Sequence, residues 1–155
     1  MPVRFIIALV AVFILACSPE KKILKSFQLG HYQTVIDHYL KVLEKNPENV
    51  KANFFVAESY RHSNRIKNAG PYYEKVSGSG FNPDSVRFFY AEALRANGDY
   101  SGAEEALTKL INESKITALR DYARRQLEGI QSLESIAKKQ NYYKVKNLEA
   151  INTQH

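Results

Sequence analysis

The chain has 155 residues, of which 45% are apolar and 25% charged, and its formal net charge is +6. This composition is ordinary for one globular or repeat domain, and it excludes a chain that is mostly disordered or of low complexity. The single Cys excludes an internal disulfide. The basic excess is mild and scattered, so it indicates no particular class of partner.

The first 16 residues predict an export signal. Arg4 precedes an unbroken apolar run from Phe5 to Ala16, which is shorter than the about 20 residues that a helix needs to cross a bilayer. The run ends in Ile-Leu-Ala-Cys, which resembles the box at which bacterial lipoprotein signal peptides are cut and the new N-terminal Cys is acylated. We therefore expect a signal peptide over 1–16 and lipidation at Cys17. The alternative is a simple signal peptide followed by an unmodified Cys.

Lipoprotein sorting gives a further expectation about location. Ser18 follows the acylated Cys, where an Asp commonly retains lipoproteins in the inner membrane. Two or more acyl chains give stable attachment. We expect the protein to be lipid-anchored in the outer membrane and to face the periplasm.

The next hundred residues contain a repeat with a period of 34 residues, seen when Gly30, Asn64 and Gly98 are aligned. Each unit has two apolar stripes at helical spacing with a turn between them. The pattern predicts three helix-turn-helix units, at about 17–49, 50–83 and 84–115. Three columns keep their chemistry from unit to unit: Val35, Ala69 and Ala103; Tyr39, Tyr73 and Leu107; Val42, Val76 and Leu110.

The turn residues have physical roles in this pattern. Gly30 and Gly98 tolerate positive φ, and Asn64 is the next most tolerant residue type, so we expect all three to end the first helix of their unit. Asp99 is placed to cap the second helix of the third unit. The small side chain of Ala103 lets two helices approach closely.

These residues resemble the tetratricopeptide repeat. Ala91, Gly98, Asp99, Tyr100 and Ala103 match its pattern best, whereas the second unit has Asn-Arg-Ile in place of Gly-Asp-Tyr and Phe81 in place of Pro. The resemblance implies an all-α solenoid of helix pairs, with an inner face lined by the first helix of each unit.

The chain after the third unit predicts one more helix and a tail. A helix over about 116–140 would cover the last apolar surface of the stack, as a solenoid requires. Residues 141–155 have no helical period, and we interpret them as a tail or linker. The apolar face of the helix would be formed by Leu119, Tyr122, Leu127, Ile130, Leu133 and Ile136.

No motif indicates catalysis. The four His residues have no metal-ligand spacing, and a phosphate-binding Gly loop, a nucleophile elbow and an HExxH motif are absent. Neighbouring carboxylates such as Glu104 and Glu105 are typical of a solvated helix face. The basic and aromatic residues at 138–146 would suit nucleic acid, but export removes that partner. We expect no enzyme, no metal, no cofactor and no small-molecule substrate.

Phe, Glu and Arg recur at the same positions of the second and third units. Glu58 with Arg61 and Glu92 with Arg95 would be helix-surface pairs that stabilise by about 0.2 to 0.5 kcal/mol each, with the phenylalanines partly in the core. Alternatively they line a peptide-binding groove, since Arg and aromatic residues are common interface anchors. The inner-face positions that the repeat family implies for partner binding are Lys51, Phe54, Glu58, Arg61, His62, Phe88, Glu92 and Arg95.

Three longer stretches, AESYRHSNRIKNAGPYYEKV, FYAEALRANGDYSGAE and VKNLEAINTQH, resemble the N-terminal repeat region of Bacteroidetes OmpA-family outer-membrane lipoproteins of the PorE kind. This resemblance implies a scaffold for interactions with other envelope proteins, in type IX secretion or gliding motility. Peptidoglycan binding is not carried over, because the chain stops before the domain responsible for it.

Other functions remain open at this stage. One is an outer-membrane protein assembly factor resembling BamD, which would bind a barrel-insertase partner. A cargo-binding chaperone or an enzyme is a third possibility.

Overall fold

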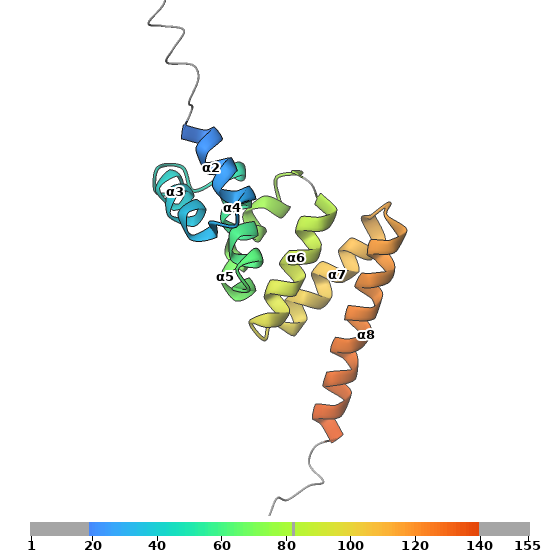
Figure 1. Ribbon diagram of the computed structural model, residues 1–155. Coiled ribbons are helices and arrows are strands. Elements are labelled where there is room, and N and C mark those ends of the chain that lie inside the picture. The colour runs from blue at the N-terminus through green and yellow to red at the C-terminus, as the bar shows by residue number, and fades with distance from the viewer. Residues whose placement is uncertain (1–18, 82, 140–155) are drawn as a thin grey trace, which may run out of the picture.

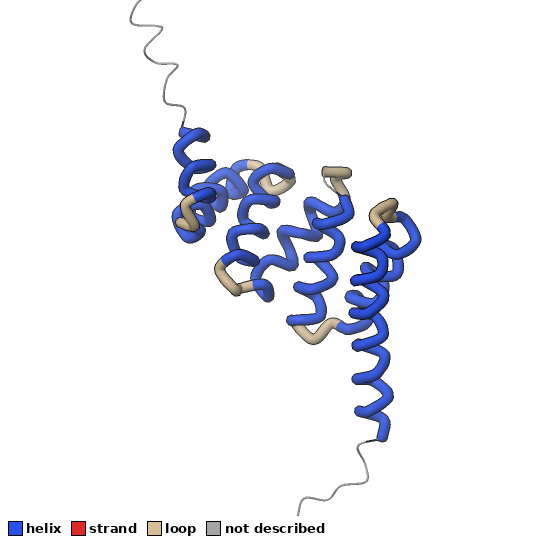
Figure 2. Tube along the Cα trace, turned by 45° about the vertical axis from the view of Figure 1, so that its right-hand side comes forward, coloured by secondary structure: helices blue, strands red, loops and turns tan. Residues whose placement is uncertain are grey.

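The computed structural model describes residues 19–81 and 83–139. Within these ranges the structure consists of helices and connecting turns, without a strand (Figure 2). The predicted signal peptide, Cys17 and the tail at 141–155 lie outside the described residues. The helices are α2 (Pro19–Gln28), α3 (Tyr32–Lys45), α4 (Val50–His62), α5 (Ile66–Ser77), α6 (Pro83–Ala96), α7 (Tyr100–Glu113) and α8 (Thr117–Lys139).

The helices pack in chain order, each against the next, from α2 at one end to α8 at the other (Figure 1). Helices α2 with α3, α4 with α5, and α6 with α7 form three hairpins, and α8 covers α7. This arrangement confirms the predicted all-α solenoid of three helix-turn-helix units with a C-terminal capping helix. The second half of α8 extends past α7 in both views. None of the helices in the described ranges has the length and hydropathy needed to cross a bilayer.

The turns inside the three hairpins share one geometry. Gly30, Asn64 and Gly98 have φ of 77°, 58° and 83°, as their residue types predict. The N–H of the next residue reaches back five positions in each turn, from His31 to Ser26 (2.9 Å), from Arg65 to Tyr60 (2.8 Å) and from Asp99 to Leu94 (3.0 Å). This bond is that of a Schellman cap, so the left-handed residue is what ends each first helix.

Side-chain caps at the helix N-termini differ from unit to unit, unlike the turns. Asp99 accepts a hydrogen bond from the backbone N–H of Gly102 (2.9 Å), which confirms the predicted cap of α7. His31 and Arg65, at the equivalent positions, make no side-chain cap bond. Asn49 caps α4 through Ala52 (2.9 Å), a role that the repeat pattern did not suggest.

The core runs through the stack as three adjoining clusters. Val35, Ala69 and Ala103, which form one column of the repeat, each have 0% exposure. The position at which a small side chain was predicted to allow close helix approach is therefore fully buried. Tyr73 and Leu107, from the column that begins with Tyr39, are buried as well. The repeat frame derived from the sequence is therefore the frame of the core.

Pro71 lies inside α5, where it has no N–H to donate to the carbonyl of Lys67. Asn97, at the end of α6, donates its side-chain N–H to that carbonyl instead (2.9 Å). Gly70 is buried, and a Cβ added there would lie 3.7 Å from that of Ala93. A Cβ at Gly70 would thus make an ordinary contact with α6, and the side chain of Asn97, directly after α6, satisfies the carbonyl left without a partner.

We predict that Ala103→Leu lowers the free energy of unfolding by about 1 to 3 kcal/mol, because a larger side chain overpacks a fully buried contact. Glu105→Ala, on the exposed side of the same helix, should change it by less than about 0.5 kcal/mol. Thermal unfolding followed by circular dichroism measures both. Equal effects at the two positions would contradict the repeat frame.

Candidate functional site on the inner face

The eight predicted partner-binding residues all lie on α4 and α6, the first helices of the second and third units. Their environments differ in spite of the repeat. Glu58 and Phe88 are each only 8% exposed. Lys51 and His62 are exposed, and Phe54, Arg61, Glu92 and Arg95 are half-buried. The inner face is defined as the side of α4, α6 and α8 that carries these residues and Tyr122.

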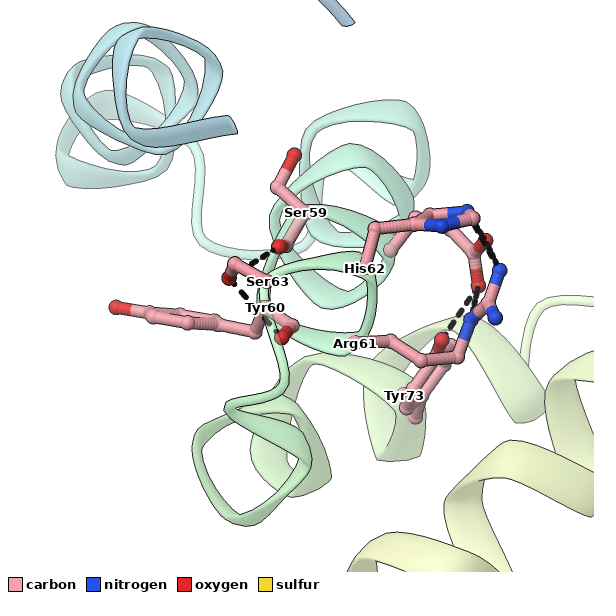
Figure 3. Close-up of polar contacts among 7 residues, drawn as sticks. Ser59, Tyr60, Arg61, His62, Ser63 and Tyr73 are labelled. Carbon is pink, nitrogen blue, oxygen red and sulfur yellow. Dashed lines mark hydrogen bonds and ion pairs between the residues drawn. The ribbon is translucent and has the colours of Figure 1, made fainter. Parts of the chain in front are cut away.

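Glu58 is the centre of a buried polar cluster between α4 and α5. Its carboxylate accepts hydrogen bonds from Arg61 Nε (3.1 Å) and Nη2 (2.6 Å), and from the hydroxyl of Tyr73. The side chains of Arg61 and Tyr73 converge from two helices in Figure 3. Burial, and secondarily the charge of Glu58, raise the pKa of Tyr73 far above its usual value. Tyr73 therefore stays protonated and remains a donor.

Arg61 has further contacts that hold it in place. Its guanidinium lies 4.1 Å from the ring centre of Phe89 on α6, and its Nη2 lies 2.7 Å from Nε2 of His62. The predicted ion pair with Glu58 forms, but the expectation that it lies on the helix surface is wrong. Because Arg61 neutralises a buried carboxylate, it is a structural residue of the stack.

His62 connects the second unit to the first. Its ring stacks on Tyr32 at 5.4 Å and meets Phe27 edge-on at 5.7 Å. Its Nε2 lies 2.7 Å from Nη2 of Arg61 and 3.5 Å from a carboxylate oxygen of Glu58, so the ring also borders the Glu58 cluster. Much of the imidazole is thus used in packing between units.

The third unit repeats the ion pair in a more open setting. Arg95 Nη2 donates to Glu92 at 2.9 Å, and 40% of the Arg95 side chain is exposed against 25% for Arg61. We attribute this difference in exposure to the repeat column of Tyr39, Tyr73 and Leu107, in which Tyr73 of the second unit is replaced by Leu107 in the third. Leucine has no hydroxyl to offer, so Glu92 has no donor on α7 comparable to Tyr73 and stays closer to solvent.

The two recurring phenylalanines also differ. Phe88 lies in the core cluster between α6, α7 and α8, and its ring meets Tyr122 edge-on at 5.1 Å. Little of its surface is left for a partner, so its main role is packing. Phe54 is half-buried against Phe55 (5.6 Å) and Phe81 (5.1 Å). Phe81, in the turn before α6, is 46% exposed.

Lys51 is paired with Glu20 of α2 across the first two units. Both side chains are at least half exposed, so the pair contributes little to stability. The carboxylate of Glu20 nevertheless neutralises the charge of Lys51 at the end of the inner face nearest the N-terminus.

Several residues that form or contact the inner face were not identified as such from the sequence. Tyr73 and Tyr122 were assigned to the apolar faces of their helices, and the hydroxyl of Tyr73 meets Glu58 only through helix packing. Phe89 follows Phe88 directly in sequence, and no spacing rule indicated that Arg61 would lie over its ring. The signal that could have suggested Tyr73 is the exchange of Tyr for Leu within an otherwise constant column.

No group of three or more His, Cys, Asp or Glu side chains in the described ranges is placed to hold a metal ion. A shallow cavity of about 240 Å³ lies where α5 ends beside α6 and α7. None of the eight inner-face residues lines this cavity. Its lining consists of Ser77, Gly78, Arg87, Tyr90, Glu105, Ala106 and Lys109.

Comparison with known proteins gives a likeness in structure only. No protein-family model and no curated protein sequence match the chain. The structure is similar to that of SycD, the type III secretion translocator chaperone of Yersinia enterocolitica, with a TM-score of 0.59 and 17% sequence identity. The likeness covers 74% of this chain and 82% of SycD. At this identity it shows a shared helical-repeat fold, and a fold does not by itself determine function.

We predict that Arg61→Glu and Arg95→Glu have unequal effects on stability. Arg61→Glu places a second carboxylate beside buried Glu58 and should lower the free energy of unfolding by about 3 kcal/mol or more. Arg95→Glu alters a pair that is substantially exposed, and it should cost about 1 kcal/mol or less. Chemical denaturation of the two variants side by side measures the difference. Similar losses would mean that the Glu58 cluster is not a buried structural element.

Proposed function

We propose that the protein is a lipid-anchored scaffold for protein-protein interactions in the bacterial cell envelope. The observation that carries the proposal is the inner face at α6 and α8, where Arg95 and Tyr122 stay about 40% exposed beside packed aromatic residues. Arg and Tyr are enriched among the residues that dominate binding at protein interfaces. The partner is thus a protein, and the proposal involves no catalysis, metal or cofactor.

The helical-repeat fold supports this proposal. Stacked helix pairs bury one face of each helix and leave an extended surface, which proteins of this architecture use for binding. SycD, which shares the fold, is a translocator chaperone. A role in secretion or gliding motility rests on the sequence resemblance to envelope lipoproteins and is proposed here on that basis.

Lipidation at Cys17 completes the proposal. The apolar run before it ends in a lipoprotein-like box, and α2 begins at Pro19. Acyl chains on Cys17 would therefore hold the first unit next to the membrane, with the α8 end of the stack farthest along the chain from the anchor. In this proposal the protein is anchored in the outer membrane and faces the periplasm.

Labelling of cells with a fatty-acid analogue tests the anchor. The wild-type protein should incorporate the label and sediment with outer membranes, because Cys17 supplies the acylated group. Cys17→Ser should abolish labelling and release the protein from the membrane fraction. Ser18→Ala is the matched control and should retain both. Labelling that survives in Cys17→Ser would disprove the lipoprotein assignment.

Chemical cross-linking in intact cells, followed by purification from membranes, tests the interaction surface. Arg95→Glu should fold with little loss of stability and lose its cross-linked partners, since a reversed charge no longer complements the partner. Lys109→Glu, an exposed change on α7 that alters the net charge by the same amount, is the control and should keep them. If Arg95→Glu recovers every partner, the inner face is not the binding surface.

A further inference from the structure

We propose that the α8 end of the inner face binds an acidic, partly apolar segment of the partner protein. The contact residues are Arg95, Tyr122 and Arg125, called here the C-terminal arginine site. This inference rests on the proposed scaffold function and adds the chemistry of the segment that is recognised.

The inner face near the N-terminus offers little net charge to a partner. Lys51 is neutralised by Glu20, and Arg61 by Glu58. Arg61 is further engaged by the ring of Phe89. Because these cations are already paired within the chain, a partner that displaced them would leave a carboxylate unpaired.

The α8 end has more cations than carboxylates. Arg95 is bonded to Glu92 through Nη2 alone, and 40% of its side chain is exposed, although its Nε is buried without a hydrogen-bond partner among the described residues. Arg125 is exposed and lies over the ring of Tyr122, 5.4 Å from its centre. Within the described ranges, no carboxylate forms an ion pair with Arg125. Arg125 is therefore a cation over the ring of Tyr122 without an ion-pair partner in these ranges, and Arg95 adds a guanidinium that is paired with Glu92 but 40% exposed.

Tyr122 joins these groups into one surface. Its ring meets Phe88 edge-on at 5.1 Å, which fixes α8 against α6. The hydrogen bond to Glu92 raises the pKa of Arg95, with smaller contributions from Tyr100 and Tyr122. Tyr122 is 44% exposed, so its ring offers an aromatic surface next to the guanidinium of Arg125.

The chemistry of this surface selects the ligand. A guanidinium binds a carboxylate through two parallel hydrogen bonds, with a strength and geometry that neutral groups do not match. Farther along the same stripe of α8, at helical spacing from Tyr122, Leu133 and Ile136 are 52% and 57% exposed. A segment with Asp or Glu at one end and apolar side chains at the other would complement both parts of the helix.

Panning a random-peptide phage library on the purified full-length protein tests this inference. Wild type should enrich peptides that carry Asp or Glu near apolar residues. Arg125→Glu should lose these peptides and enrich basic ones, because the charge of the site is reversed. Arg124→Glu is the matched control, since Arg124 is the next residue, is 51% exposed and pairs with Asp121 (2.8 Å). It should enrich the same peptides as wild type.

Fluorescence anisotropy then measures the contribution of the acidic residues directly. The most enriched peptide is compared with a copy in which Asp and Glu are replaced by Asn and Gln, and the copy should bind wild type about tenfold or more weakly. Equal binding of the two peptides, or enrichment of the same peptides by Arg125→Glu, overturns this inference and leaves the scaffold proposal intact. If no peptide is enriched and Arg95→Glu keeps its partners in cells, both proposals fail.

Discussion

The structure depends on one constraint, which is that no helix pair can bury its apolar face without the next pair. Val35, Ala69 and Ala103 occupy the same position in the three units and are completely buried, so each second helix lies close against its neighbours. Stability in such an array comes from the interfaces between adjacent units. The helix α8 is required for the same reason, because Leu107 and Leu110 of α7 would otherwise face water.

Within this constraint, equal residues at equal positions acquire different roles. Glu58 and Glu92 are related by the repeat, and so are their arginines. In the second unit the hydroxyl of Tyr73 donates a hydrogen bond to Glu58 between α4 and α5. Glu58 is therefore buried there, as part of the core. In the third unit Leu107 takes the place of Tyr73, and Glu92 stays nearer to the surface. The exchange of Tyr73 for Leu107 thus accompanies a difference in exposure between two similar ion pairs.

The same asymmetry divides the inner face along its length. Toward the N-terminus, its charges are paired and His62 is stacked between units. Toward α8, Arg95, Tyr122 and Arg125 stay accessible and α8 continues beyond α7 with apolar side chains exposed. A lipid anchor at Cys17 would lie at the opposite end of the chain. The proposed function thus assigns attachment to one end of the stack and recognition to the other.

The sequence by itself determined the fold, because a 34-residue period, helical apolar spacing and turn residues with positive φ are local properties that each unit repeats. It also identified the helices that form the inner face. Only the tertiary structure decided which of the eight candidate side chains remain exposed. Burial of Glu58 and Phe88, and the cap that Asn97 gives to Lys67, depend on residues about 15 to 34 positions away. Such contacts arise from the packing of one helix on another, which periodicity within a helix does not specify.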